Sequence, residues 1–295
     1  MLRIGVIGMS KGNGHPYSWA AIFNGFNKDE MAHCPFPVIP EYLSKQSFPE
    51  DFLCNSAKVT HIWTQDLKIS KQVAFASKID NVVNNIEDLC GIVDAVLLAR
   101  DDAENHVEMA MPFLKAGLPI FIDKPFALTM KEANTMLSSQ KFESQIFTCS
   151  SLRYAQELIL NKDEVESLGH IDYVEGAIMN KWETYGIHIL EPLVSQLPNR
   201  GKLLDVRAEI SDGFHVVNIR WKRCKATLKI TGTIKSDLAI SFSGNNHKII
   251  KKFSDSFSCF RTSLSTFIDS ISEKKILIAR QETLELVEIL QKGRL

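Results

Sequence analysis

The 295-residue sequence has little net charge, no long apolar run and no closely spaced pair of cysteines. A net charge of −1 gives no general attraction to nucleic acid or to an anionic membrane, so we expect neither as a partner. No apolar run approaches the ~18 residues that a membrane-spanning helix requires. The six cysteines are scattered and no signal peptide is evident, so we expect reduced thiols and a cytoplasmic protein.

The sequence also lacks an internal repeat, a heptad pattern and any His/Cys spacing that would indicate a metal site. What it has is an ordinary composition, with 45% hydrophobic residues in a chain that is long for one core. We therefore expect two domains, formed by residues 1–150 and 151–295.

Strand-like and helix-like segments alternate through the first half. The expected strands are 2–7, 59–63, 81–83, 93–99, 118–123 and 145–149, and the helices between them are 18–26, 69–76, 86–89, 104–116 and 129–138. This alternation indicates right-handed crossovers and a parallel sheet covered on both faces. We expect an α/β fold whose N-terminal domain is a Rossmann-like, doubly wound parallel sheet.

The second half has a different pattern, typical of an α+β domain. Helices are expected at 155–168, 185–197, 256–272 and 280–292, and strands at 171–179, 203–209, 214–221, 226–231, 237–243 and 247–253. Short polar turns between the later strands predict an antiparallel meander. One face of this largely antiparallel sheet needs cover, so we expect a homo-oligomer that pairs through it.

Lys124 occupies the most informative position in the chain. It follows the apolar strand 118–123 and precedes Pro125, which disfavours the helical conformation for the residue before it. In a parallel sheet this strand end faces the ligand crevice, where an ammonium can meet a hydroxyl, carbonyl or phosphate. The alternative is a solvated loop lysine.

The turn after the first strand is rich in glycine but lacks G-x-G-x-x-G. Gly8, Gly12 and Gly14 are present, and Ser10 stands where the second glycine of that pattern would be. A longer turn would let Gly12 and Gly14 approach a pyrophosphate, with the Ser10 hydroxyl on phosphate. A glycine-rich loop without phosphate is the alternative.

The second strand is followed by Thr64, with Asp66 two residues further on. An acid near this position commonly binds the ribose hydroxyls of NAD. A neutral Thr64 admits the 2′-phosphate of NADP, whereas Asp66 could reach the ribose; a plain turn is as compatible with these residues. The expected cofactor is therefore NAD or NADP.

Several motifs resemble the glucose–fructose oxidoreductase and inositol dehydrogenase family, Gfo/Idh/MocA. They are Val93–Ala99, Asn105-His106, Ala116–Pro125 with its Asp123-Lys124-Pro125, and Tyr185–His188. The resemblance implies NAD(P)-dependent oxidation or reduction of a sugar, cyclitol or nucleotide-sugar carbon, and a C-terminal sheet that mediates oligomers.

The resemblance also implies roles for individual residues. Lys124 would hold and polarise the reacting oxygen, and His188 would exchange the proton, because histidine titrates near neutrality. Asp123 and Lys124 would also contact the cofactor, and Tyr185 and His188 the substrate. We expect the ammonium and the imidazole to meet across the nicotinamide.

Three departures from the family pattern stand out. Asp123 replaces the usual glutamate, and Thr184 replaces the acid that commonly precedes the histidine by four residues and orients it. Residues 28–57, rich in Pro and Phe, form an insertion that we expect to shape specificity rather than chemistry.

Other residues suit the pocket less specifically. Arg100 and Asp101 end the fourth strand and could bind substrate hydroxyls, or Arg100 could pair with an aspartate. Arg153 lies at the junction of the domains and could touch substrate or be a surface residue. The segment 15–19 could line the substrate side, or only cap and pack its helix.

The sequence is compatible with three functions. The first is a dehydrogenase or reductase that uses Lys124 and His188. The second is a dinucleotide-binding sensor or regulatory protein on the same fold, which the irregular glycine turn and Thr184 allow. An NAD-assisted glycosidase or lyase is a third reading.

Overall fold

The computed structural model describes all residues 1–295 and contains two compact units. The first comprises residues 1–127, 131–148 and 260–279, and the second comprises 128–130, 149–259 and 280–295. The units are not consecutive segments of the chain, because 260–279 completes the first unit after the sheet of the second.

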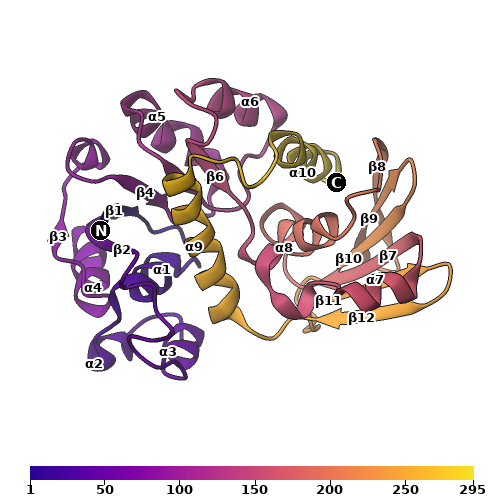
Figure 1. Cartoon of the computed structure of the whole chain (residues 1–295), viewed down its shortest axis with the longest axis horizontal. Coiled ribbons are helices and arrows are strands. Elements are labelled where there is room, and N and C mark those ends of the chain that lie inside the picture. Colours follow the sequence, from indigo (N-terminus) through magenta and orange to yellow (C-terminus); the bar gives the residue numbers. More distant parts are fainter. The chain divides into compact units, whose positions relative to one another are not determined.

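A six-stranded sheet forms the centre of the first unit (Figure 1). Its strands are β1 (Leu2–Ile7), β2 (Ala57–Trp63), β3 (Asn81–Val82), β4 (Ala95–Leu98), β5 (Ile120–Ile122) and β6 (Ile146–Thr148). All neighbours are parallel, in the order β3-β2-β1-β4-β5-β6. The predicted Rossmann-like sheet is confirmed, and its order reverses between β1 and β4, where such sheets bind ligands at the carboxyl ends of the strands.

Helices connect these strands. They are α1 (His15–Asn24), α2 (Lys28–Met31), α3 (Val38–Leu43), α4 (Leu67–Ala76), α5 (His106–Ala116) and α6 (Met130–Ser138), with 3-10 turns at Ile86–Leu89 and Ala103–Asn105. Helix α5 ends where Gly117 adopts the left-handed conformation with φ of 78°. The strands β4 and β5 are buried along their whole length, as a sheet covered on both faces requires.

The second unit contains a six-stranded mixed sheet (Figure 1). Its strands are β7 (Ile171–Ile178), β8 (Leu203–Ser211), β9 (Phe214–Trp221), β10 (Lys225–Ile230), β11 (Ala239–Gly244) and β12 (Lys248–Lys252). The order is β12-β11-β7-β10-β9-β8, with β7 parallel to β10 and the other pairs antiparallel. The largely antiparallel α+β sheet is confirmed, but the continuous meander is wrong, because β7 separates β10 from β11.

The helices of the second unit are α7 (Lys162–Leu168), α8 (Trp182–Ser195) and α10 (Arg280–Lys292). The prediction of one helix over 155–168 is wrong: 3-10 turns occupy Ser151–Tyr154 and Gln156–Leu158, and α7 begins only after Asn161. The side chains of Asn161 and Glu164 form a reciprocal capping box, which fixes this later start.

One long helix, α9 (Ser256–Glu273), lies mostly within the first unit. Its Phe267 ring is 5.7 Å from Phe121 of β5 and 5.8 Å from Phe147 of β6, measured between ring centroids. Helix α9 therefore contributes to the aromatic core beside the strands that precede it by more than a hundred residues.

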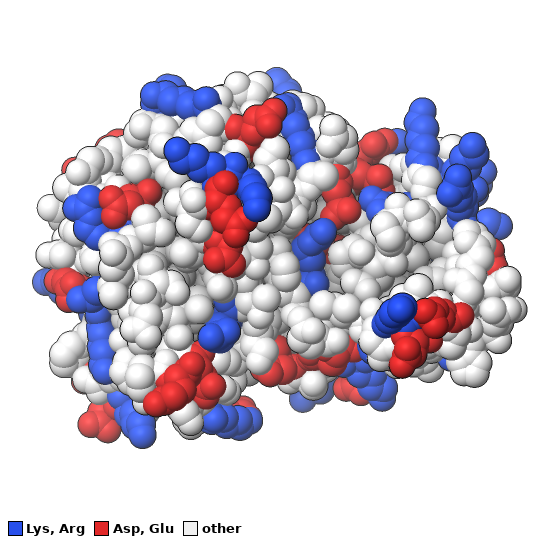
Figure 2. Space-filling view, viewed as in Figure 1, with Lys and Arg blue, Asp and Glu red and all other residues white.

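The charged side chains do not separate by sign on the face drawn in Figure 2, where basic and acidic groups are interspersed. This agrees with the net charge of −1. None of the helices combines the length and the apolar character needed to span a membrane.

Candidate functional site

The turn between β1 and α1 presents a set of unpaired backbone donors. Within the protein, the N–H of Asn13 donates to the Ser10 carbonyl and that of His15 to the Asn13 side chain. The N–H groups of Ser10, Lys11, Gly12 and Gly14 have no such acceptor. Successive unpaired N–H groups at the start of a helix form a binding place for an anion such as phosphate.

The three glycines of this turn have different surroundings. A Cβ atom on Gly8 would lie 2.2 Å from Pro16 Cγ, and one on Gly14 would lie 2.5 Å from Ile39 Cδ1. Gly12 has φ of 85° and nothing within 4 Å of such an atom. Gly8 therefore allows the helix to pack on the strand and Gly14 makes room for the insertion, which leaves Gly12 as the open approach to the backbone.

The end of β2 is held by its own hydrogen bonds. Thr64 Oγ1 donates to the Asp66 carbonyl at 2.7 Å, and Asp66 Oδ1 caps α4 by accepting from the Lys68 N–H at 2.7 Å. Gln65 has no signal in the sequence that would mark it as a site residue. Its side chain accepts from Met9 N at 2.9 Å and donates to Met9 O at 2.6 Å. Gln65 therefore clamps the start of the glycine turn to the end of β2.

Arg100 is a framework residue in this arrangement. Its Nε donates to Asp102 Oδ1 at 2.9 Å, and its Nη1 donates to Gln65 Oε1 at 3.0 Å. Burial raises the pKa of Asp102, but the hydrogen bonds from Arg100 and Asn105 outweigh it, so the net shift is downward. Arg100 is thus paired with an aspartate, and its predicted contact with substrate hydroxyls stays a prediction.

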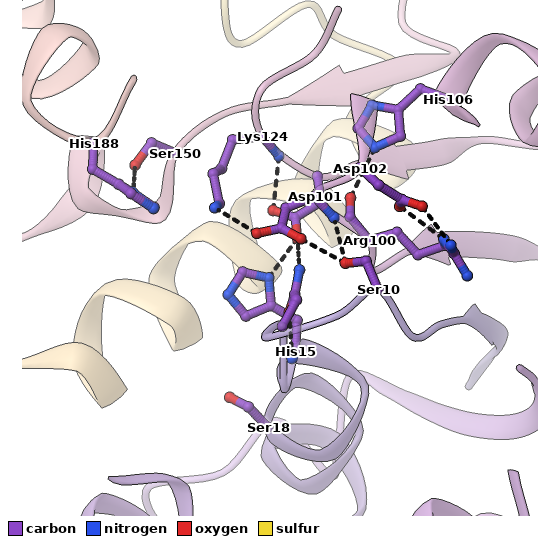
Figure 3. A network of polar contacts seen from close by, with 12 residues as sticks. Ser10, His15, Ser18, Arg100, Asp101, Asp102, His106, Lys124, Ser150 and His188 are labelled. Carbon is purple, nitrogen blue, oxygen red and sulfur yellow. Dashed lines mark hydrogen bonds and ion pairs between the residues drawn. The ribbon is translucent and has the colours of Figure 1, made fainter. Parts of the chain in front are cut away.

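Lys124 lies just after β5 with its side chain buried (Figure 3). Its Nζ is 3.3 Å from Asp101 Oδ2, and Asp101 Oδ1 accepts from the Ser10 hydroxyl at 2.5 Å. The Asp101 N–H in turn donates to Ser10 Oγ at 3.1 Å. Ser10 Oγ is thus committed to Asp101, while the ammonium of Lys124 lies at the same sheet edge as the unpaired N–H groups.

Asp101 is ionised at neutral pH and balances this lysine. Burial raises the pKa of its carboxyl group, but Lys124, the Ser10 hydroxyl and His15 together lower it further than burial raises it. The net shift is downward. A fixed carboxylate therefore holds the Lys124 ammonium in place.

Asp123 is a buried carboxylate that is hydrogen-bonded to the end of the glycine turn and to Lys124. Its side chain is only 1% exposed and accepts from Asn13 Nδ2 at 3.0 Å, His15 Nδ1 at 2.5 Å and the Lys124 N–H at 2.7 Å. The predicted cofactor contact of Asp123 stays a prediction, because every hydrogen bond that it makes in the structure is to the protein.

His188 belongs to the second unit, on α8. Its Nδ1 is 2.8 Å from Ser150 Oγ (Figure 3). The Tyr185 ring meets its imidazole edge to face with centroids 5.4 Å apart. The Ser150 N–H donates to Glu191 Oε2 at 2.6 Å. Ser150, fixed by Glu191, is thus the hydrogen-bond partner of His188 Nδ1.

Glu191 is a carboxyl group buried in the second unit. Its Oε1 receives no hydrogen bond and has Arg153 Nη1 at 3.5 Å, while Arg153 Nη1 lies much closer to Glu282 Oε1, at 2.5 Å. Burial raises the pKa of Glu191 from 4.5 to about 7, against the opposing effects of Arg153 and the Ser150 N–H. Arg153 is therefore an internal counter-charge here, and its predicted contact with substrate stays a prediction.

We expect Glu191 to make the stability of the second unit depend on pH. Because its pKa is higher in the folded state, its contribution is complete below about pH 4.5 and is lost as the pH rises through about 7. The free energy of unfolding should fall by about 3 kcal/mol between these limits, and Glu191→Gln should remove that fall. Urea unfolding at several pH values measures it, with Glu166→Gln, at an exposed helix position, as control. Equal pH slopes in the wild type and Glu191→Gln would contradict the assignment.

The structure brings together many of the residues selected from the sequence. In the first unit, Gly8, Ser10, Gly12, Gly14, Arg100, Asp101, Asp123 and Lys124 lie at the turn or at the carboxyl ends of β1, β4 and β5. Thr64 and Asp66 close their own turn at the end of β2. In the second unit Arg153, Tyr185 and His188 are connected through Ser150 and Glu191.

These features fit a dinucleotide. The unpaired N–H groups at positions 10–12 and 14, and the open side of Gly12, suit its pyrophosphate, and the first turn of α1 carries no acidic side chain that would repel it. The Lys124 ammonium adds positive charge at the same edge. Gly12 and the N–H groups beside it are the residues that would hold the phosphates.

Comparison with known proteins agrees with this fit. GenD2 from gentamicin A biosynthesis, solved with NAD, is 14% identical with a TM-score of 0.74, and the match covers 99% of this chain and 92% of that one. Biliverdin reductase from Synechocystis, solved with biliverdin and NADP⁺, is 12% identical with a TM-score of 0.69, covering 98% and 97%. UDP-N-acetylglucosamine 3-dehydrogenase GnnA from Acidithiobacillus ferrooxidans is 12% identical with a TM-score of 0.70, covering 99% and 96%. At these identities the likeness concerns the fold.

A search of curated proteins found no match. The model of the family GFO_IDH_MocA, described as an oxidoreductase family with an NAD-binding Rossmann fold, matches residues 2–150. The turn, the sheet order and the strand-end lysine are all within that span. The chain therefore belongs to the Gfo/Idh/MocA family of oxidoreductases, whose cofactor is a nicotinamide dinucleotide, NAD or NADP.

Proposed function

We propose that the protein is a dehydrogenase or reductase acting on a CH–OH carbon of a sugar, cyclitol or nucleotide sugar. The observation that carries this proposal is the buried Lys124 ammonium at the end of β5, held by Asp101 beside a turn with unpaired N–H groups. One protein with the same fold, GnnA, is a UDP-N-acetylglucosamine 3-dehydrogenase by name, which supports a nucleotide sugar or a related compound as substrate.

The chemistry divides between two side chains. When bound, the nicotinamide accepts a hydride from the substrate carbon or returns one to it. Lys124 binds the reacting oxygen through its ammonium group, whose charge stabilises oxyanion character there. His188 takes the hydroxyl proton in oxidation and returns it in reduction.

Ser150 and Asp101 have supporting functions in this proposal. Ser150 orients the imidazole of His188 through Nδ1, and Nε2 exchanges the proton with substrate. Asp101 holds the Lys124 ammonium in place for its polarising function. In this proposal Arg153 and Tyr185 contact the substrate. Arg153 is held near Glu191, and Tyr185 is held against His188.

Self-association is also part of this proposal. The sheet of the second unit exposes Leu204, Ile210 and Ile250, which are apolar side chains that a second copy would cover. Light scattering of the purified protein measures the number of subunits.

A direct test separates this function from the alternatives. NADH and NADPH are titrated while tryptophan fluorescence is followed, and then sugars, cyclitols and nucleotide sugars are screened with both oxidised cofactors at the nicotinamide absorbance band. We expect binding of one dinucleotide and net reduction with at least one of these compounds.

Other outcomes would redirect the assignment. Cofactor binding without turnover across the panel would favour the sensor. This alternative has support in the turn, where Ser10 Oγ and the Met9 N–H donate to Asp101 and Gln65 rather than facing a ligand. Transient reduction without net change would favour a glycosidase or lyase.

A further inference from the structure

Ser150 connects His188 to a buried acid, Glu191, which lies one helical turn further along α8. The Ser150 N–H donates to Glu191 Oε2 at 2.6 Å. The Ser150 hydroxyl lies 2.8 Å from His188 Nδ1 (Figure 3). The other carboxylate oxygen, Glu191 Oε1, is buried and receives no hydrogen bond. A histidine and a buried carboxyl group therefore share one hydrogen-bond partner within the second unit.

Glu191 belongs to a buried charge cluster, whose members are Arg153, Arg200, Glu191, Glu282 and Glu285. Arg153 Nη1 lies 2.5 Å from Glu282 and 3.5 Å from Glu191. Arg200 lies 2.8 Å from Glu285 through Nε and 3.9 Å from Glu282 through Nη2. No member has a side chain more than 19% exposed. Three carboxyl groups thus face two guanidinium groups, so the cluster has one negative charge in excess when every member is ionised.

The excess charge falls on Glu191. Glu282 and Glu285 each have a guanidinium nitrogen within 2.8 Å, whereas the nearest one to Glu191 is 3.5 Å away. Burial is the main cause that raises the pKa of Glu191 to about 7, with a smaller contribution from Glu282. The uncompensated carboxylate therefore forms as the pH rises through neutrality.

An imidazolium at His188 would supply the missing cation. Residues three apart on a helix lie on the same face, with Cβ atoms about 5–6 Å apart. The strands that pack against α8 contribute buried apolar side chains, such as Val174 and Leu228, and the ring against His188 on its own helix is that of Tyr185. Since such surroundings strengthen the attraction between opposite charges, an ionised Glu191 favours the protonated form of His188.

We propose that Glu191 is a positioning residue that stabilises the imidazolium of His188, so that the two residues titrate as a coupled pair. In oxidation a substrate O–H bond breaks and its proton bonds to His188, while the electron pair of the C–H bond leaves with the hydride to the nicotinamide. The carboxylate of Glu191 balances the charge that His188 gains. This rests on the proposed function, in which His188 exchanges the substrate proton.

The first test follows the imidazole signals by NMR in the cofactor-free protein, where no turnover is needed. In the wild type, the His188 titration should spread over a wider pH range than that of an independent histidine, because protonating Glu191 removes a charge that favours the imidazolium. Glu191→Gln keeps an acceptor for the Ser150 N–H but has no charge, so it should narrow the curve and lower its midpoint by about 1 pH unit. Glu191→Asp keeps the charge and should move the midpoint back toward that of the wild type.

Three controls make this test specific. His188→Asn identifies the signal by its loss. His215, which is hydrogen-bonded within the same unit, should keep its signal in every variant and thereby reports folding. Glu285→Gln is the matched control, because it removes the same charge at a carboxylate that Arg200 holds, and it should shift the midpoint less than Glu191→Gln does. Equal curves in the wild type and Glu191→Gln, or an equal shift in Glu285→Gln, would overturn the proposal.

Kinetics provide the second readout. With a substrate from the screen, Glu191→Gln should lower kcat for oxidation about threefold with little change in KM, because His188 becomes a weaker base. The acid limb of the pH profile should move down by about 1 pH unit, together with the NMR midpoint. A variant that had only lost packing would be slower without this displacement of the limb.

The outcomes separate the two proposals. A His188 titration that Glu191→Gln leaves unchanged overturns the function of Glu191 and leaves the dehydrogenase standing. Coupled titration in a protein that turns over no compound of the panel removes the dehydrogenase, and the balancing of a substrate proton by Glu191 with it.

Discussion

Replacing Lys124 by methionine is expected to lower kcat by about 10²- to 10³-fold, because an ammonium that stabilises charge on the reacting oxygen is lost. Methionine keeps an unbranched stem in a buried position, so packing changes little. The steady-state rate with a substrate from the screen measures the effect.

The same substitution leaves Asp101 without its cation, which could disturb folding. The double variant Lys124→Met with Asp101→Asn restores local neutrality and should recover thermal stability while remaining inactive. Activity that returns with neutrality would show that the lysine serves only as a counter-charge, and the proposed function of Lys124 would then be wrong.

Substituting His188 by asparagine is expected to have the other large effect, a loss of about 10²- to 10⁴-fold in kcat with a smaller change in KM. Ser150→Ala should cost about tenfold, since it removes one hydrogen bond worth ~1 kcal/mol and leaves the imidazole present but less well oriented. The dependence of kcat on pH distinguishes the two variants. His188→Asn should remove one limb of the pH profile, and Ser150→Ala should retain it. A larger loss in Ser150→Ala than in His188→Asn would contradict this order.

The element order of both units could be predicted from sequence because it depends on local pattern. Alternating strands and helices, with Pro125 and Gly117 at their boundaries, gave the six parallel strands. The position of β7 between β10 and β11 could not be predicted. The hydrophobic pattern of a strand does not indicate which strand about fifty residues away it pairs with. The start of α7 does have a local signal, because Asn161 and Glu164 have the spacing of a capping box.

The site followed the same rule. The residues next to Lys124 and His188 in the sequence predict both as site residues. Their hydrogen-bond partners, in contrast, lie far away along the chain. Ser150 is 38 residues from His188, and Asp123 is 108 residues from His15. Such pairs are fixed by the fold, so the sequence shows that position 184 lacks an acid, but it does not show that Ser150 contacts His188.

The return of residues 260–279 to the first unit has a consequence for biosynthesis. A ribosome releases the glycine turn, the strand-end lysine and the whole of the second unit's sheet before it releases Phe267, whose ring packs on Phe121 and Phe147. The nucleotide-binding unit therefore stays incomplete until residues 260–279 have been synthesised. Nascent chains halted before this helix should remain protease-sensitive in their N-terminal residues. Domains of multidomain proteins usually fold in order from the N-terminus during synthesis, whereas here the first unit cannot be completed before the sheet of the second unit has been made.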